Sequence, residues 1–198
     1  MTTIYTIGHS NHDEHAFLHL LGRFGVTLIA DVRSHPYSRF SQFNREFLEA
    51  LLRGYGIGYH FLGRELGARE PETQSVVSGA ADWAQLPHQP LFSAGLGQVV
   101  AAADRQIVAL LCAEKEPLDC HRTVVICRHL RSPDLRLRHL LADGSAEAHE
   151  DTEQRLLAQS GLQRNLFDQE TSDADLLERA YDQRSREILR HPAGEEEP

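Results

Sequence analysis

The sequence predicts one α/β domain with three layers, in which helices cover both faces of a mostly parallel sheet of about five strands. Short apolar runs alternate with segments whose apolar residues have helical spacing, and this alternation is typical of parallel strands joined by crossover helices. The predicted strands are apolar along their length, as expected for strands buried on both faces. A chain of 198 residues has the size of one such domain rather than two.

The first third of the chain contains three predicted strands and two predicted helices. Asn11 or Asp13 can cap the first helix, and Gly25 ends it, as glycine often does at a helix C-terminus. Gly58 weakens the third strand because it has no side chain to pack. The predicted strands are 4–7, 27–30 and 57–62, and the helices carry Phe17, Leu18, Leu20, Leu21 and Phe24, then Phe47, Leu48, Leu51 and Leu52.

A long segment, 63–90, separates these elements from the rest of the domain. It is rich in Gly, Pro, Ser and Gln, and a connection of this length is usually functional or mobile. After it the pattern of strands and helices resumes. We predict helices at 91–103 and 123–130 and strands at 106–111 and 135–141, the last ending at Asp143-Gly144.

Beyond the last predicted strand the sequence becomes helical and polar. We therefore divide the chain into an α/β domain at 1–150, a helical extension of the same domain at 151–190 and a disordered acidic tail at 191–198. An apolar face on the extension can either cover the domain or form a homodimer. Its residues are Leu176, Leu177, Ala180, Tyr181, Ile188 and Leu189.

Composition narrows the classes of function. A net charge of −9 disfavours general binding to nucleic acid, although a local basic cluster could still bind it. Three cysteines without framework spacing do not indicate a disulfide scaffold, and we expect a reducing cytoplasm. The N-terminal residues lack the features of a signal peptide, and no apolar run approaches the roughly 18 residues that span a membrane.

Unusual polar residues follow four of the predicted strands. They are His9 and Ser10 after the first strand, Asp31, Arg33 and Arg39 after the second, Arg64 and Glu65 after the third, and the segment CAEKEPLDCHR at 112–122 after the fourth. The carboxyl ends of parallel strands meet at one edge of a sheet, where ligands of open α/β proteins bind. We therefore predict a single site at this edge.

Arginines dominate the predicted binding groups, because guanidinium forks bind carboxylate or phosphate in a bidentate way. A helix that starts near Asp119 or Cys120 would add backbone N–H groups that favour an anion. We expect Ser10 and His121 to assist. The alternative, that these arginines form structural ion pairs with Asp31, Glu65 or Glu114, stays open. The candidate anion-binding arginines are Arg33, Arg39, Arg64 and Arg122.

Several residues are candidates for the chemistry itself. Carboxylates that lie close together have pKa values pushed apart, which suits Asp31, Glu65 and Glu114 to acid and base roles. His9 is a candidate general base, and Cys120 is a candidate nucleophile because a helix N-terminus lowers a thiol pKa. No cofactor is predicted. A metal stays possible, with Cys112, Glu114, Cys120 and His121 as a weaker alternative ligand set.

The motifs together resemble the family called domain of unknown function 488 (DUF488). They are TIGHS at 6–10, DVR at 31–33, SRF at 38–40, GIGYHFLGRELG at 56–67, CAEKEPLDCHR at 112–122 and HLLADGSAEAH at 139–149. The likeness extends over nearly the whole chain. It implies an α/β sandwich with these motifs around one pocket, and it implies no catalytic assignments.

Three hypotheses about function follow. The first is an enzyme that acts on a small anionic or nucleotide-like substrate by hydrolysis or group transfer, with arginines holding the anion. The second is a non-catalytic module that binds a nucleotide or a nucleic-acid end. The third is thiol or sulfur chemistry at Cys120.

Overall fold

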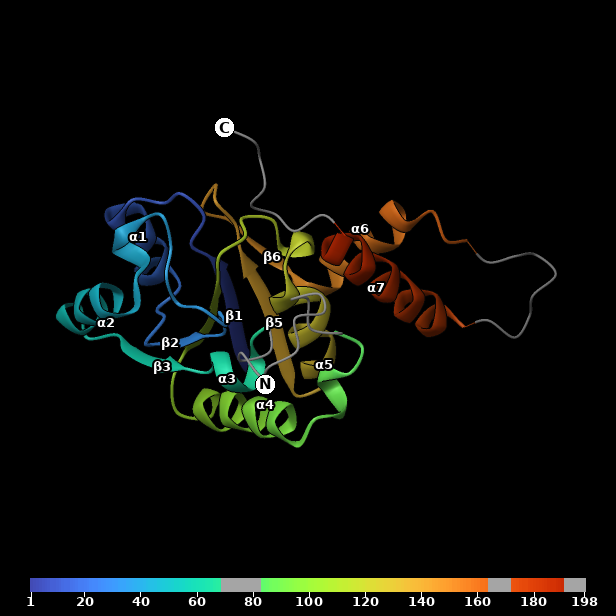
Figure 1. The fold of residues 1–198 in the computed structure, drawn as a ribbon, viewed down its shortest axis with the longest axis horizontal. Helices are drawn as coiled ribbons and strands as arrows, with labels where there is room; N and C mark the ends of the chain where they lie inside the picture. Colours follow the sequence, from blue (N-terminus) through green and yellow to red (C-terminus); the bar gives the residue numbers. More distant parts are fainter. Residues whose placement is uncertain (69–82, 164–171, 191–198) are drawn as a thin grey trace, which may run out of the picture.

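A six-stranded, mostly parallel sheet forms the centre of the molecule in the computed structural model, which describes residues 1–68, 83–163 and 172–190 (Figure 1). Its strand order is β3-β2-β4-β1-β5-β6. The first five strands run parallel, and β6 pairs with β5 in the antiparallel sense. The strands are β1 (Thr2–Gly8), β2 (Leu28–Asp31), β3 (Gly58–Phe61), β4 (Val108–Cys112), β5 (Leu135–Leu140) and β6 (Ala146–Ala148).

This architecture confirms the predicted fold class and adds the short strand β6, which the sequence pattern did not show. The helices are α1 (Glu14–Arg23), α2 (Arg45–Gly54), α3 (Gly63–Leu66), α4 (Pro90–Ala103), α5 (Arg128–Leu130), α6 (His149–Ser160) and α7 (Asp173–Arg190). Short 3-10 turns occur at Ser41–Phe43, Leu86–His88 and Pro117–Asp119. The predicted cap is present, because the Asp13 carboxylate accepts a hydrogen bond of 2.7 Å from the Ala16 N–H.

The predicted helix at 123–130 has an unusual form. It begins as a π-helix, Arg122–Cys127, and continues as the short helix α5. A π-turn is wider than an α-turn and is frequent at functional sites. Every residue of this π-helix is buried, so its side chains, including those of polar residues, point into the protein.

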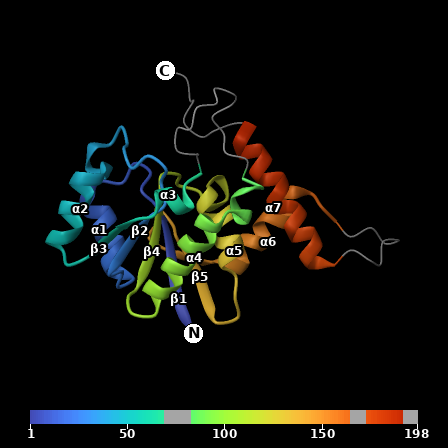
Figure 2. The ribbon, with the colours of Figure 1, turned by 60° about the horizontal axis from the view of Figure 1, so that its bottom comes forward.

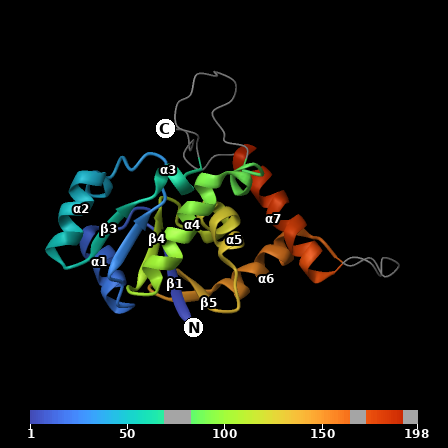
Figure 3. The same cartoon turned by 90° about the horizontal axis from the view of Figure 1, so that it is seen from below.

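Two hydrophobic cores lie on opposite faces of the sheet, because successive strand residues point to opposite sides. Helices α1 and α2 cover one face with Phe17, Leu21, Leu48 and Leu52. Helices α3, α4 and α5, with the π-helix, lie on the other (Figure 3). The strands β1 and β4 contribute to both cores, with Ile7 and Leu111 on the first side and Ile4 and Leu110 on the second. The site residues described below are therefore divided between two faces of one sheet.

The helical extension packs on the second core. Helices α6 and α7 lie side by side next to α5 (Figure 2), and Leu176, Ala180 and Tyr181 of α7 are buried in the core. The apolar face predicted for this helix thus covers the domain, and the predicted homodimer stays untested. The acidic tail at 191–198 and residues 69–82 of the predicted long segment lie outside the described residues.

Among the helices of the described ranges, none has both the length and the apolar character needed to cross a bilayer.

Candidate metal centre

The carboxyl ends of β1 and β4 lie side by side and place the segment 112–122 against the segment 8–10. The His9 N–H donates to the Cys112 carbonyl at 2.9 Å, and the Ser10 N–H donates to the Ala113 carbonyl at 2.8 Å. Gly8 permits this close approach, because a Cβ atom at this position would lie 1.7 Å from the Glu114 carbonyl oxygen. The glycine of the TIGHS motif is therefore required by the chain that crosses over it.

Four side chains of this segment meet on the face of the sheet covered by the π-helix. The thiols of Cys112 and Cys120 lie 3.0 Å and 2.9 Å from the same carboxylate oxygen of Glu114, Oε2. Nδ1 of His121 lies 3.5 Å from Sγ of Cys112 and 3.9 Å from Sγ of Cys120. The two sulfur atoms and a ring nitrogen of His121 all lie within 4.8 Å of one another. Two thiols, an imidazole and a carboxylate thus converge on one small volume.

These distances match those of a tetrahedral metal site. With a Zn–S bond of about 2.3 Å and a Zn–N bond of about 2.0 Å, a sulfur and a nitrogen ligand are about 3.5 Å apart. The two observed distances between sulfur and Nδ1 agree with this value. The shorter distances to Glu114 are those of S–H···O hydrogen bonds, which two protonated thiols make to a carboxylate.

The backbone orients His121 as a ligand. Its Nε2 lies 3.2 Å from the carbonyl oxygen of Val32 at the end of β2. A carbonyl can only accept, so Nε2 carries a proton, and Nδ1 points toward the thiols. Burial lowers the pKa of His121, but the hydrogen bond to Cys120 and the charge of Glu114 raise it overall, so a metal ion would displace a proton from Nδ1. Metal-bound histidines usually donate their second N–H to a carbonyl or carboxylate in this way.

Arg122 supplies a positive charge that is wholly inside the protein. Its side chain is 0% exposed, and its guanidinium donates to the carbonyl oxygens of Glu114 at 2.6 Å and Lys115 at 3.4 Å. Its backbone N–H lies 3.4 Å from Sγ of Cys120. Within the described ranges Arg122 has no ion pair. A buried cation without a bonded anion favours ionised thiols nearby, because a thiolate would compensate its charge.

Burial controls the protonation of the cluster. It raises the pKa of Cys112 and, with the neighbouring Cys112 thiol, raises that of Cys120 well above the usual value. Burial also opposes ionisation of Glu114, but the hydrogen bond from Cys120 and the charge of His121 lower its pKa overall. Without a metal the cluster therefore holds two protonated thiols and a carboxylate, and metal binding would release the thiol protons.

A second polar group occupies the opposite face of the sheet. Arg33 forms a two-point ion pair with Asp31, in which Nε lies 2.9 Å from Oδ1 and Nη2 lies 2.6 Å from Oδ2. Tyr59 donates a further hydrogen bond of 2.8 Å to Oδ2 of Asp31. The side chains of Arg33 and Asp31 are 5% and 0% exposed. This pair has the form of the structural ion pair that the sequence left as an alternative.

His9 lies between these two groups. Its ring stacks on Phe43 at a centroid distance of 4.5 Å, and its Nδ1 lies 3.0 Å from the Ser10 carbonyl oxygen. Burial, and then the charge of Arg33, lower the pKa of His9 to about 4, against the opposing effects of the hydrogen bond to Ser10 and the charge of Glu114. A neutral imidazole at pH 7 can accept a proton, which keeps His9 a candidate base.

The remaining predicted residues lie outside the cluster. Arg39 and Arg64 are exposed, and Arg39 lies over the Phe40 ring at 5.0 Å. No ion pair involves either arginine in the part of the chain that the structure describes. Glu65 is partly buried, and its Oε2 has no hydrogen-bond partner. Ser10 adopts a positive φ of 45° and donates its hydroxyl to Asn11.

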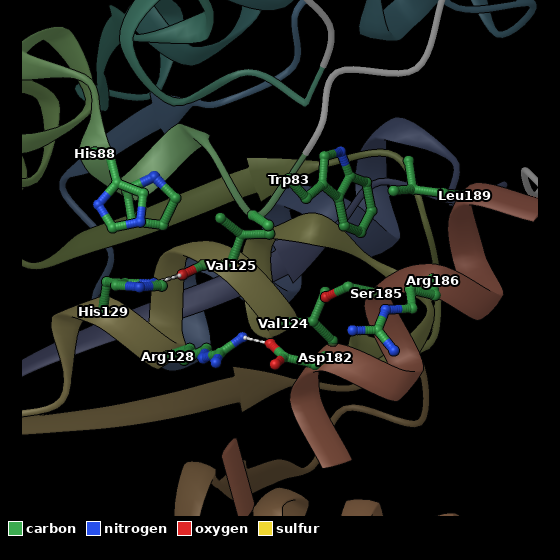
Figure 4. Close-up of a pocket in the computed structure, with 12 residues that line it drawn as sticks. Trp83, His88, Val124, Val125, Arg128, His129, Asp182, Ser185, Arg186 and Leu189 are labelled. Carbon is green, nitrogen blue, oxygen red and sulfur yellow. Dashed lines mark hydrogen bonds and ion pairs between the residues drawn. The ribbon is translucent and has the colours of Figure 1, made fainter. Parts of the chain in front are cut away.

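Sequence reasoning did not find the cavity of about 410 Å³ that lies beside the π-helix (Figure 4). Val124 and Val125, one turn after Cys120 and His121, form part of its wall. Trp83 also lines it, and the Trp83 ring lies 6.1 Å from that of His121. The position of this lone tryptophan was the available signal. Other lining residues are His88, Arg128, His129, Asp182, Ser185, Arg186 and Leu189.

Comparison with known proteins gives a family and nothing narrower. The family model described as "Domain of unknown function DUF488" matches residues 14–128, which is more than half of the chain. No curated protein and no solved structure matches.

Proposed function

The chain belongs to the DUF488 family, and we propose from the geometry of its site that it is a metal-dependent hydrolase acting on a small anionic molecule. Cys112, Cys120 and His121 would bind an ion of the zinc type, and Glu114 would act on a water held by that ion. The observation that carries the proposal is the convergence of these side chains, with distances between sulfur and Nδ1 of 3.5 Å and 3.9 Å.

The exposure of the four residues favours a catalytic over a structural site. Catalytic zinc usually has three protein ligands and keeps a fourth position for water, whereas structural zinc has four closed protein ligands. Cys112, Cys120 and His121 are buried, whereas Glu114 is partly exposed. Glu114 thus lies on the solvent side of the proposed ion, where a metal-bound water would be placed.

The proposed chemistry needs one proton acceptor and no further cofactor. Metal-bound water has a pKa near 7. Cys112, Cys120 and His121 would hold the ion, which would supply an activated water for hydrolysis. Glu114 would accept a proton beside it and donate that proton to the leaving group. Zinc deaminases also combine His and Cys ligands with a glutamate that transfers protons.

The cavity beside the π-helix is the candidate site for a small anionic substrate, and its link to the cluster is Trp83, whose ring lies 6.1 Å from that of His121. The cavity volume of about 410 Å³ falls in the range of pockets that bind small molecules. Trp83 offers a ring for stacking, and Arg186 is an exposed cation that has no ion pair in the described ranges. A nucleotide-like molecule has both a planar ring and an anionic group. The protein would act in the cytoplasm, where its thiols stay reduced.

Metal content is the first test. Purified protein should contain zinc, and Cys120→Ser should lose one equivalent relative to the wild type, while Ser10→Ala, at a partly buried position whose hydroxyl hydrogen-bonds only to Asn11 in the described ranges, should lose none. Replacement by cobalt should give thiolate charge-transfer bands that Cys120→Ser weakens. Equal metal content in the wild type and Cys120→Ser would overturn the proposal.

Catalysis has its own test. Addition of azide to the cobalt protein should change its visible spectrum if the fourth position is open. The zinc protein should hydrolyse a compound among nucleoside monophosphates and dinucleotides, and EDTA should abolish this turnover. A cobalt spectrum that azide leaves unchanged would show a closed, structural site. Ligand-induced thermal stabilisation without any product would indicate the non-catalytic binding module.

Thiol chemistry at Cys120 has less support from the geometry. Its side chain is 1% exposed, and burial raises its pKa, whereas reactive thiols are accessible and have a lowered pKa. Fast, selective alkylation of Cys120 by iodoacetamide at pH 7 would favour that chemistry over the metal proposal.

A further inference from the structure

A second group of metal-ligand atoms lies inside the domain, on the same face of the sheet. We infer that Cys127, His139 and His149 form a second metal site, distinct from the one at Cys112, Cys120 and His121. The Cys127 sulfur and one nitrogen from each histidine all lie within 4.8 Å of one another. All three residues are buried. The inference concerns a separate ligand set and does not depend on the proposed hydrolase activity.

Three different elements bring these residues together. Cys127 is the last residue of the π-helix, His139 lies in β5, and His149 is the first residue of α6. The antiparallel pairing of β5 with β6 places His149 beside His139, because the hairpin returns the chain to the same end of the sheet. A ligand set drawn from three rigid elements is held in place without the ion.

The two imidazoles have the arrangement of two ligands to one ion. Nε2 of His139 lies 3.0 Å from Nδ1 of His149, and two nitrogen ligands of one zinc ion are about 3.3 Å apart. The outer nitrogens have partners of their own. Nδ1 of His139 lies 2.8 Å from Oγ1 of Thr6, and Nε2 of His149 lies 3.1 Å from the Tyr181 hydroxyl. Such outer partners orient metal-binding histidines.

A hydrogen-bond chain without metal is the competing explanation. In it Thr6 donates to His139, His139 donates to His149, His149 donates to Tyr181, and Tyr181 donates to Glu153 at 2.9 Å. This chain accounts for both histidines. It does not account for Cys127, which has no hydrogen bond to either ring in the described part of the structure. Cys127 therefore distinguishes the two explanations.

The electrostatic environment suits a cation held by neutral imidazoles. Burial is the main cause that lowers the pKa of His149 to about 4 and that of His139 well below its usual value. Both rings are then unprotonated at neutral pH. Burial raises the pKa of Cys127 to about 12, against the influence of Arg122. Metal binding would therefore release one proton from Cys127, and affinity should increase with pH.

A cavity borders this group at His149. His149 and Leu137 line a cavity of about 500 Å³, together with Glu150, Glu153 and Arg131. Arg128 also lines this cavity, and Arg131 pairs with Glu153 at 3.2 Å, so Glu150 is the carboxylate that remains to attract a cation. The ligand set of one thiolate and two imidazoles fits zinc, and it also fits copper, which binds such sets in trigonal form.

Stoichiometry of zinc in the full-length protein tests the inference. We expect two equivalents in the wild type, one in Cys127→Ala, one in Cys120→Ala and none in the double variant. Cys127→Ala is the informative change because it leaves the chain from Thr6 to Glu153 intact. Wild-type zinc content in a folded Cys127→Ala protein would overturn the second site. If Cys127→Ala loses zinc and Cys120→Ala does not, the second site is supported and the first site is overturned.

A titration of the wild-type protein with cobalt keeps the test decisive if Cys127→Ala does not fold. The first site would give charge-transfer absorption from two thiolates and the second from one. Two spectrally distinct equivalents support the inference, and a single equivalent with two-thiolate absorption rules out the second site.

Discussion

The thiol of Cys120 lies 2.9 Å from Oε2 of Glu114, and the same oxygen lies 3.0 Å from the thiol of Cys112. A single carboxylate oxygen thus accepts from both candidate metal ligands. If a metal replaced the two thiol protons, this oxygen would lose both donors and would face the ion or its bound water. Glu114 therefore carries the negative charge of the metal-free cluster, and it is placed to accept a proton when a metal ion is bound.

Glu114→Gln separates the role of a base from that of a ligand. We expect the variant to keep its zinc and its thiolate-to-cobalt absorption, because Cys112, Cys120 and His121 remain. The pH-dependent change in the cobalt spectrum that reports ionisation of bound water should shift, and metal-dependent hydrolysis should fall by about 10²–10⁴-fold.

Glu116→Gln is the matched control for this change. Glu116 is a neighbouring glutamate that pairs with Arg155 at the surface, so its loss should leave both spectrum and turnover unchanged. Loss of zinc from Glu114→Gln would instead make Glu114 a fourth ligand of a closed site.

The ion pair between Arg33 and Asp31 makes a prediction about stability. Removing one partner of a buried pair leaves an uncompensated charge, so Asp31→Leu and Arg33→Met should each lower the free energy of unfolding by about 3–5 kcal/mol. The double variant should recover much of this loss, because two apolar side chains replace two charges.

Urea denaturation of the four proteins measures this coupling. Additive losses in the double variant would show that the two charges do not depend on each other. They would leave Arg33 available as the anion-binding group that the sequence predicted.

The fold, and the meeting of the β1 and β4 ends that brings the segments 8–10 and 112–122 together, could be predicted from the sequence, because each depends on local patterns. Apolar runs and helical spacing identified the layers, and the carboxyl ends of parallel strands necessarily share one edge. The resemblance to the DUF488 family was confirmed over residues 14–128. The strand β6, with three residues of intermediate burial, is too short to give a pattern.

The division of the site between two faces could not be predicted, because it depends on register. Asp31 and Val32 are adjacent, yet the carboxylate of Asp31 pairs with Arg33 on one face, and the carbonyl of Val32 contacts His121 on the other. A shift of one residue would exchange these roles. The burial of Arg122 likewise depends on the π-helix, and the spacing of apolar residues in the sequence does not indicate a π-helix.

The titration of His9 makes the stability of the protein depend on pH. Burial, and then the charge of Arg33, lower its pKa from 6.5 to about 4, while the hydrogen bond to Ser10 and the charges of Glu114 and Asp31 act in the opposite direction. The unfolded chain binds a proton near pH 6.5 and the folded protein only near pH 4. Stability from this residue is therefore present above pH 6.5 and is lost as the pH falls toward 4, by roughly 3 kcal/mol.

Urea unfolding of His9→Gln between pH 7.5 and pH 4.5, in EDTA, checks this dependence. The variant should lose less stability than the wild type as the pH falls, whereas His15→Gln, at an exposed position, should follow the wild type. Parallel curves for His9→Gln and the wild type would show that His9 ionises equally in both states.

Gly8→Ala tests whether the crossing of two chain segments holds the metal centre in place. The added Cβ would lie 1.7 Å from the Glu114 carbonyl oxygen and 3.1 Å from a guanidinium nitrogen of Arg122. Because the nearer atom belongs to the backbone, the segment that carries Glu114 must move. We expect a loss of about 1–3 kcal/mol in the free energy of unfolding, together with weaker zinc binding.

Gly97→Ala is the control, since Gly97 lies in α4 and nothing lies within 4 Å of its added Cβ. It should stabilise the protein by about 0.5–1 kcal/mol and leave zinc affinity unchanged. Measuring both the free energy of unfolding and the zinc affinity of each variant separates an effect on the fold from an effect on the metal site. If Gly8→Ala lost stability but bound zinc as tightly as the wild type, the crossing would support the fold alone, and the ligands would be held by the π-helix and β4.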